Sequence, residues 1–198
     1  EWMIDVDYAD PTVAVDFTFY IQSDQSAVVT SQTGKRSYFD HPNYRTHLTE
    51  HHNLQWATPP LADESGNALD FVLVRESTAG LFASVGKGTV PDTESTDTQV
   101  VTRKGVERVS RYAFKLASQR KARGYPGEVT SVDKANVFKS MAFWREVFKG
   151  VAAQNPDIIQ RSAYVDAVAM EMVRRPWSYD VMVTENMYGD ILSDLAAG

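Results

Sequence analysis

The alternation of strand-like and helix-like segments between residues 69 and 198 constrains the fold more than any other feature of the chain. Short apolar runs predict three strands, in the segments LDFVLVRES (69–77), VTSVDKANV (129–137) and SYDVMVT (178–184). The first of them is apolar enough to be buried on both faces, as in a parallel sheet. Amphipathic stretches predict four helices, which we place at 103–122, 140–156, 163–176 and 189–197. Strands that alternate with helices predict an α/β fold.

Two further strands are predicted near the start of the chain. VAVDFTFYI (13–21) alternates apolar and polar residues with the period of a half-buried strand, and SAVVTS (26–31) follows it. A polar loop at 86–97 lies between GLFASV and TQVVTR, which we expect to pair as strands. Thr102 is the expected N-cap of the helix that follows, because its hydroxyl can accept a bond from a free backbone N–H.

Composition excludes several classes of protein. The chain has 198 residues, of which 43% are hydrophobic, so it can bury the core of one large domain or two small ones. It has no cysteine, which excludes disulfides and thiolate metal sites, and its net charge of −6 argues against nucleic acid as a partner. Its longest aliphatic or aromatic run, FVLV, is too short for a membrane span, and no basic-then-apolar leader opens the chain. We therefore expect a cytoplasmic protein, although a start at Glu1 without Met is consistent with a fragment.

The segment HLTEH (47–51) matches the H-x-x-E-H pattern of inverted zinc peptidases. In such an enzyme His47 and His51 bind zinc, and Glu50 acts on water. Three fixed positions in five arise easily by chance, and the sequence singles out no further acidic ligand downstream. A polar helix explains the segment equally simply, and the zinc peptidase is kept as a minor alternative.

Three aspartates offer oxygen ligands for a hard cation. Asp190 and Asp194 lie one helical turn apart, where two exposed carboxylates repel each other unless something positive is bound nearby. We expect Asp190 in the first turn of its helix, where the helix dipole favours an anion. With Asp166 they would suit Mg²⁺ or Mn²⁺. The simpler interpretation is that these side chains cap helices and pair with Arg or Lys.

The segment VDKAN (132–136) places a lysine and an asparagine at the end of a predicted strand. In α/β proteins the carboxyl ends of the strands carry the ligand sites. Lys134 is a candidate general base if it is partly buried or lies beside Asp133.

Taken together, these segments resemble the β-decarboxylating dehydrogenases, the family of isocitrate, isopropylmalate and tartrate dehydrogenases. The matching segments extend in order from about Leu69 to Gly198. They are LDFVLVREST, VTRKGVERVSRYAF, VTSVDKANV, FWREVF, YVDAVAMEMV and YDVMVTENMYGDILSDLAA. The resemblance implies a mixed α/β sheet of the isopropylmalate dehydrogenase type, with helices on both faces and an incomplete cofactor domain. It also implies an enzyme in which NAD or NADP oxidises a small 2-hydroxy dicarboxylic acid with the help of Mg²⁺ or Mn²⁺, usually with loss of CO₂.

The resemblance assigns roles residue by residue. Asp190 and Asp194 resemble the metal carboxylates of one subunit, and Asp166 resembles the carboxylate lent by the partner subunit. Arg75 resembles an arginine that grips a substrate carboxylate, for which a bidentate guanidinium is well suited. Lys134 resembles a partner-donated lysine that helps to remove the hydroxyl proton. Asn136 and Asn186 are the implied cofactor-binding residues, and the shared site implies a homodimer.

Upstream of Leu69 the resemblance is weaker. YRTHLTEHHNLQW (44–56) resembles the family helix in which two substrate-binding arginines flank an Asn-Leu pair. Arg45 matches the first arginine, whereas Gln55 replaces the second. This resemblance also accounts for HLTEH as part of a substrate helix. Residues 1–25 match no family segment.

Three departures from the family pattern bear on activity. Phe82 stands where the family has a tyrosine that helps to protonate the product, and Phe cannot donate a proton. The opening glycine-rich strand and turn are not recognisable, and the segment that holds the adenosine half of the cofactor would follow Gly198. A non-catalytic or truncated homologue that dimerises without turnover is therefore the principal alternative.

We predict two domains. Residues 1–52 are expected to supply part of a dinucleotide-binding domain, and residues 53–198 the substrate-binding and dimerisation domain. The loop at 86–97 and its flanking strands are expected to form an arm that clasps a partner subunit. The sequence does not specify which hydroxy acid is bound.

Overall fold

One six-stranded mixed sheet organises the molecule, with the strand order β2-β1-β3-β6-β4-β5. The computed structural model describes residues 17–22, 27–31 and 70–197. The strands are β1 (Phe17–Gln22), β2 (Ala27–Ser31), β3 (Asp70–Arg75), β4 (Glu128–Asp133), β5 (Ile159–Tyr164) and β6 (Val181–Thr184). Strands β3, β6, β4 and β5 run parallel, whereas β1 is antiparallel to both of its neighbours, β2 and β3. The predicted mixed α/β sheet is confirmed.

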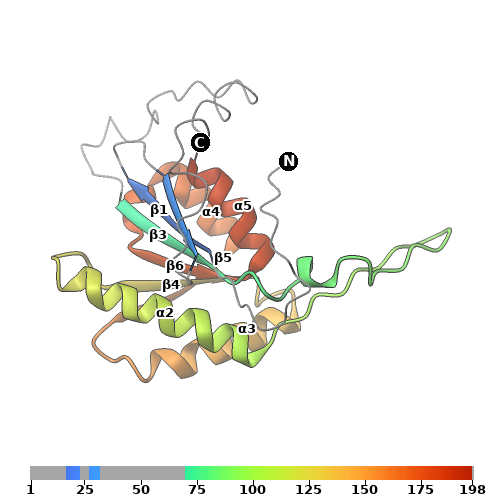
Figure 1. Cartoon of the computed structure of the whole chain (residues 1–198), viewed down its shortest axis with the longest axis horizontal. Coiled ribbons are helices and arrows are strands. Elements are labelled where there is room, and N and C mark those ends of the chain that lie inside the picture. The colour runs from blue at the N-terminus through green and yellow to red at the C-terminus, as the bar shows by residue number, and fades with distance from the viewer. Residues whose placement is uncertain (1–16, 23–26, 32–69, 198) are drawn as a thin grey trace.

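In the part of the chain that the structure describes, four helices cover the two faces of the sheet (Figure 1). They are α2 (Arg103–Lys121), α3 (Lys139–Ala152), α4 (Val165–Arg174) and α5 (Asn186–Ala197). Helices α2 and α3 pack on one face, and α4 and α5 pack on the other (Figure 1). Within the described residues, Phe82–Ser84 and Pro176–Ser178 form 3₁₀ turns. In the described part of the chain, no helix is both long enough and apolar enough to cross a membrane.

The central strand β3 shows why the sheet needs two helical layers. Val72 and Val74 belong to the core under α2 and α3, whereas Phe71 and Leu73 belong to the core under α4 and α5. All four side chains are almost completely buried. The continuous apolar run that predicted a doubly buried strand therefore packs on both sides, because neighbouring side chains of a strand point to opposite faces.

Most of the predicted element boundaries agree with the structure. Thr102 is the N-cap of α2, and its hydroxyl accepts a hydrogen bond from the backbone N–H of Gly105 at 3.1 Å. The predicted strand over 13–21 extends outside the described residues, within which β1 begins at Phe17. Strands β3, β4 and β6 are found where the apolar runs placed them.

Two details differ from the sequence prediction. Strand β5 precedes α4 and was not predicted, because its sequence IQRSAY forms an exposed edge strand without an apolar stripe. Helix α5 begins at Asn186, three residues before Gly189, so Asp190 lies in the second turn and not in the first. The side chain of Glu185 explains this earlier start, since it accepts hydrogen bonds from the backbone N–H groups of Met187 and Tyr188.

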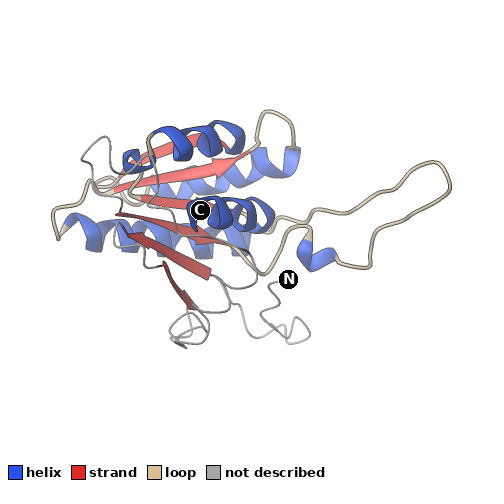
Figure 2. Cartoon of the chain, turned by 90° about the horizontal axis from the view of Figure 1, so that it is seen from above, coloured by secondary structure: helices blue, strands red, loops and turns tan. Residues whose placement is uncertain are grey.

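The arm between residues 80 and 100 projects away from the sheet (Figure 2). Its two sides are joined by isolated bridges, Gly80 with Val100 and Thr89 with Thr96, and not by the paired strands that we predicted. Residues 82–84 form a 3₁₀ turn in place of a strand. Val90 near the tip is 88% exposed, so the arm has little core of its own.

Candidate functional site

The carboxyl ends of the four parallel strands bring the candidate residues to one edge of the sheet. Arg75 ends β3, Asp133 ends β4 and Tyr164 ends β5. Strand β6 ends at Thr184, two residues before α5 begins. Parallel strands in α/β proteins place their ligand sites at this edge.

Arg75 is the centre of a first cluster. Its Nε and Nη2 atoms donate to Oδ1 of Asn186 at 2.9 and 2.7 Å, and its Nη1 atom donates to Oδ1 of Asp190 at 2.6 Å. The guanidinium also lies over the ring of Phe82, with 5.4 Å from Cζ to the ring centroid. The Arg75 side chain is only 12% exposed, whereas that of Asp190 is 49% exposed. Solvent and ligands therefore reach Asp190 more readily than Arg75.

Gly189 lets Arg75 lie against α5. A Cβ atom added at this glycine would lie 2.6 Å from Cγ of Arg75 and 2.9 Å from its Cβ atom. Such distances are too short for any side chain, so the stem of the arginine occupies the space that a larger residue would need. The glycine before Asp190 thus has a local structural role, which its place in the sequence does not reveal.

Lys134 and Asp166 form a second cluster. Lys134 follows β4 and its Nζ atom lies 2.6 Å from Oδ1 of Asp166, in the first turn of α4. This hydrogen bond is the main reason why the pKa of Asp166 lies below its usual value. The Asp166 side chain is 67% exposed, and that of Lys134 is 23% exposed. Lys134 is therefore partly buried, and the carboxylate that it contacts is that of Asp166, whereas Asp133 pairs with Arg145.

Lys134 and Arg145 both lie over the ring of Tyr164. Arg145 makes a two-pronged ion pair with the buried Asp133, at 2.8 Å from Nε to Oδ2 and 2.7 Å from Nη2 to Oδ1. Its guanidinium lies over the ring of Tyr164, with 4.8 Å from Cζ to the centroid, and Nζ of Lys134 lies 5.8 Å from the same centroid. These contacts fix the strand end that carries the lysine.

The predicted metal ligands do not converge within the described part of one chain. Asp190 and Asp194 occupy consecutive turns of α5, and both are at least partly exposed. Asp166 belongs to the other cluster. Among the described residues, no three His, Asp or Glu side chains gather where they could hold a metal ion. The donor set nevertheless suits a divalent cation, because oxygen ligands on the surface of α5 leave coordination positions for water, substrate or another carboxylate.

The remaining predicted residues are partly outside the described structure. Asn136 lies exposed in the turn after β4, close to Lys134 in the sequence. Asn186 is fully buried beside Arg75. Arg45, Gln55 and the zinc-peptidase residues His47, Glu50 and His51 lie outside the described residues. The structure therefore does not describe a role for this last group.

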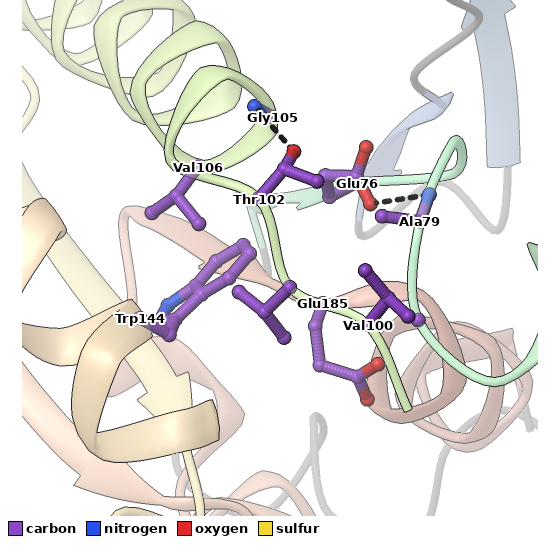
Figure 3. Close-up of a pocket in the computed structure, with 10 residues that line it drawn as sticks. Glu76, Ala79, Val100, Thr102, Gly105, Val106, Trp144 and Glu185 are labelled. Carbon is purple, nitrogen blue, oxygen red and sulfur yellow. Dashed lines mark hydrogen bonds between the residues drawn. The ribbon is translucent and has the colours of Figure 1, made fainter. Parts of the chain in front are cut away.

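Two buried carboxylates near the site were not singled out from the sequence. Glu76 and Glu185 directly follow the strand ends of β3 and β6, and each is only 2% exposed. They line a small pocket together with Val106 and Trp144 (Figure 3). Burial raises the pKa of Glu185. The sequence signal that could have identified them is a glutamate directly after an apolar strand, in VRES (74–77) and in VTEN (183–186).

These two carboxylates shape the segments that carry the first cluster. Glu76 accepts hydrogen bonds from the backbone N–H groups of Thr78 and Ala79, and it pairs with Arg108 at 2.7 Å. Figure 3 shows its bond to Ala79 beside the start of α2. Glu185 caps α5, as described above. Both glutamates are therefore satisfied structural groups at the border of the candidate site.

Comparison with known proteins identifies the same family as the sequence motifs. The family model described as isocitrate/isopropylmalate dehydrogenase matches residues 47–198. A 3-isopropylmalate dehydrogenase of Bacillus cereus is 46% identical over 134 residues, which are 68% of this chain and 36% of that protein. A 3-isopropylmalate dehydrogenase of Bacillus subtilis (strain 168) is 46% identical over 142 residues, 70% of this chain and 38% of that protein.

Solved structures agree with this assignment. The isocitrate dehydrogenase from Methylococcus capsulatus has a TM-score of 0.63 and 30% identity, covering 99% of this chain and 50% of that one. A β-decarboxylating dehydrogenase from Thermococcus kodakarensis has a TM-score of 0.54 and 39% identity, covering 67% of this chain and 37% of that one. The chain thus spans between a third and two fifths of the length of these curated relatives. Because the family model covers more than half of its residues, the chain belongs to the isocitrate/isopropylmalate dehydrogenase family.

Proposed function

We propose that the chain forms the substrate and metal half of a dehydrogenase that oxidises a small 2-hydroxy dicarboxylic acid with NAD⁺ or NADP⁺. Loss of CO₂ is expected to follow the oxidation. The observation that carries the proposal is the pair of clusters at one edge of the sheet, Arg75 with Asp190 and Lys134 with Asp166. Each supplies a different part of the chemistry, and neither is complete alone.

Arg75 is the proposed anchor for a substrate carboxylate. A guanidinium has five N–H donors, and the bonds to Asn186 and Asp190 use three of them. The other two suffice for a two-pronged bond to a carboxylate. Arg45 is proposed as a second carboxylate ligand, on the basis of the family resemblance alone.

Asp190 and Asp194 of one subunit, with Asp166 of a second copy, are the proposed ligands of Mg²⁺ or Mn²⁺. When bound, such an ion lowers the pKa of the substrate hydroxyl and stabilises the negative charge left by decarboxylation. In the structure Arg75 holds Asp190, so the metal ligand and the carboxylate anchor are joined by one hydrogen bond. This bond would keep the two ends of the substrate site in a fixed relation.

Lys134 is the proposed base for the hydroxyl proton. The amine is held by the carboxylate of Asp166, on an element that starts at the end of the neighbouring strand. A positioned base of this kind typically contributes about 10²- to 10⁴-fold to a proton transfer. Asn136, exposed in the turn that follows Lys134, is the proposed contact for the nicotinamide half of NAD(P)⁺.

A homodimer is proposed because each copy carries both halves of a site that do not meet within one chain. Helices α4 and α5 expose apolar side chains that a second copy would bury. These are Met170, Val173, Ile191 and Leu195. The arm at 80–100 is proposed as a second contact with the partner.

The division at residues 52 and 53 is kept as a proposal with one qualification. Strands β1 and β2 come from the proposed cofactor part, yet β1 pairs directly with β3 over six residues. One sheet therefore crosses the proposed boundary. The two parts are expected to unfold together where they share this sheet.

Phe82 supports the alternative of a non-catalytic homologue. Its ring packs under Arg75 but carries no hydroxyl to protonate the product. In the proposed enzyme, either water supplies that proton or the reaction stops at oxidation. The zinc peptidase has less support, because the family match begins at His47 and so includes the HLTEH segment.

The proposal is tested by the formation of NADH or NADPH from malate, tartrate, isocitrate and isopropylmalate, with and without Mg²⁺. Reduction of the dinucleotide with one acid, abolished by a chelator, is the expected result. Binding of Mg²⁺ and an acid without any reduction would instead favour the non-catalytic homologue. Stoichiometric zinc in the purified protein, with activity unaffected by Asp190→Asn, would show that the assignment is wrong.

A further inference from the structure

Asn186 holds Arg75 from the side that faces away from Asp190. Its Oδ1 atom accepts from both Nε and Nη2 of the guanidinium, so it fixes the plane of the group and not only its position. Its Nδ2 atom donates to the backbone carbonyl of Ala79 at 2.9 Å. Because a carbonyl can only accept, the amide nitrogen must face Ala79 and the amide oxygen must face Arg75.

Burial separates this residue from any ligand. Asn186 has no exposed surface, and both ends of its amide are engaged within the chain. Its neighbour Gly80 leaves little room, since a Cβ atom there would lie 3.2 Å from Cβ of Asn186. A dinucleotide could contact the amide only if these elements moved apart.

We propose that Asn186 is a positioning residue for Arg75, and so for the substrate carboxylate, rather than a cofactor-binding residue. The inference rests on the proposed function for the role of Arg75 as a carboxylate anchor. Asn186 holds the guanidinium of Arg75, and Gly189 leaves the space that the aliphatic part of the same side chain fills. Together, Asn186 and Gly189 would hold the two remaining N–H groups of the guanidinium in position for the substrate carboxylate, while Nη1 stays bonded to Asp190.

The first test measures binding of the acid and of the dinucleotide separately, by calorimetry with Mg²⁺ present. Asn186→Ala removes the acceptor and should weaken binding of the acid about tenfold to hundredfold, since hydrogen bonds to charged groups are the stronger ones. Affinity for NAD(P)⁺ should stay within about twofold, because Asn186 does not touch it in this proposal. Asn186→Asp keeps an acceptor for Arg75 and should retain more of the acid affinity than the alanine variant.

Two further variants separate positioning from general damage to the fold. Gly189→Ala should reproduce the pattern of Asn186→Ala, because its methyl group would displace the stem of Arg75. In an Arg75→Lys background, Asn186→Ala should cause little further loss, since two residues that act through one interaction are not additive. Asn136→Ala serves as the matched asparagine, and it should weaken the dinucleotide and spare the acid.

A spectroscopic readout is independent of catalysis. The Nε–H proton of Arg75 should exchange slowly with water in the wild-type protein and in Asn186→Asp, and rapidly in Asn186→Ala, by NMR. Loss of NAD(P)⁺ affinity with unchanged acid affinity would overturn the inference, as would additive effects with Arg75→Lys. A wild-type protein that binds acid but never reduces NAD(P)⁺ would contradict the proposed function alone. A wild-type protein that binds none of the acids would overturn both.

Discussion

Arginine–aspartate ion pairs lie at both ends of the parallel strands, but they are buried at the amino ends and partly exposed at the carboxyl ends. At the start of the strands, Arg120 lies between Asp180 and Asp70, with 2.5 Å from Nε to Asp180 and 2.9 Å from Nη1 to Asp70. The side chains of Arg120 and Asp180 are 8% and 1% exposed. At the carboxyl ends, Asp190 and Asp166 are 49% and 67% exposed, although each also has a cationic partner.

The number of satisfied atoms explains this difference. Both oxygens of Asp180 are engaged, since Oδ2 accepts from the backbone N–H groups of Gly127 and Glu128. The guanidinium of Arg120 also lies 4.0 Å from the ring centroid of Tyr125. Such a closed network stabilises the fold and offers nothing to a ligand. An ion pair with an open carboxylate can exchange its partner for a metal ion or substrate, so exposure distinguishes the candidate site from the structural network.

The largest expected effect is that of Asp190→Asn on activity. In the proposed enzyme Asp190 is a metal ligand, and its loss would remove several kcal/mol of stabilisation of the reacting charge, which corresponds to about a thousandfold in kcat/KM. The free energy of unfolding should change by about 1 kcal/mol or less, because the ion pair with Arg75 is half-exposed. Enzyme kinetics and denaturant unfolding together check this prediction. Glu146→Gln, an exposed carboxylate change on α3, is the control. Equal losses of stability and activity would show that Asp190 has a structural role, like that of Asp180.

Arg120→Met should have the opposite effect. Removing one partner of a buried ion pair leaves a buried charge unpaired and typically costs about 3–5 kcal/mol of folding free energy. The kcat of the molecules that remain folded should be unchanged, since Arg120 lies at the far edge of the sheet. Arg111→Met, which breaks an exposed pair with Glu107, should cost about 1 kcal/mol or less. If Arg120→Met lowered kcat without lowering stability, the claim that the ion pairs at the amino ends of the strands are purely structural would be wrong.

Glu185 lies beside the candidate site, but it is buried and hydrogen-bonded like the network around Arg120. Its substitution is expected to have the smallest effect of the three. Burial raises its pKa above the ordinary value of 4.5, and the nearby charge of Glu76 acts in the same direction. Its contribution to stability is therefore fully present below pH 4.5 and is lost as the pH rises through the raised pKa. Glu185→Gln should flatten this part of the stability–pH curve, measured by denaturant unfolding at a series of pH values. The same slope in both proteins would show that the pKa of this carboxyl is the same in the folded and unfolded states, which contradicts the prediction.

The sequence specified most of the elements because their signals are local. The run FVLV predicted a doubly buried strand, and Thr102 predicted the start of α2, and both predictions are confirmed. Strand β5 was missed because an exposed edge strand needs no apolar alternation. The start of α5 was placed too late because its cap is a glutamate, Glu185, which is outside the usual set of N-cap residues.

The candidate site was only partly predictable for a different reason. Arg75 and Asn186 are 111 residues apart, and only the pairing of β3 with β6 brings their side chains together. No spacing in the sequence indicates that Asn186 is buried behind the arginine. Lys134 and Asp166 likewise meet because β4 and β5 are neighbours. The family resemblance selected the residue types, whereas the topology of the sheet sorts them into two clusters.

The central claim is that one active site takes Arg75 and Asp190 from one subunit and Lys134 and Asp166 from another. Mixing two inactive variants, Asp190→Asn and Lys134→Ala, tests it most directly after the subunits are allowed to reassort. Hybrids should make up about half of the dimers and carry one intact site of two, which gives about a quarter of the wild-type activity. Complete inactivity of a mixture whose hybrids are shown by native mass spectrometry would contradict the shared site.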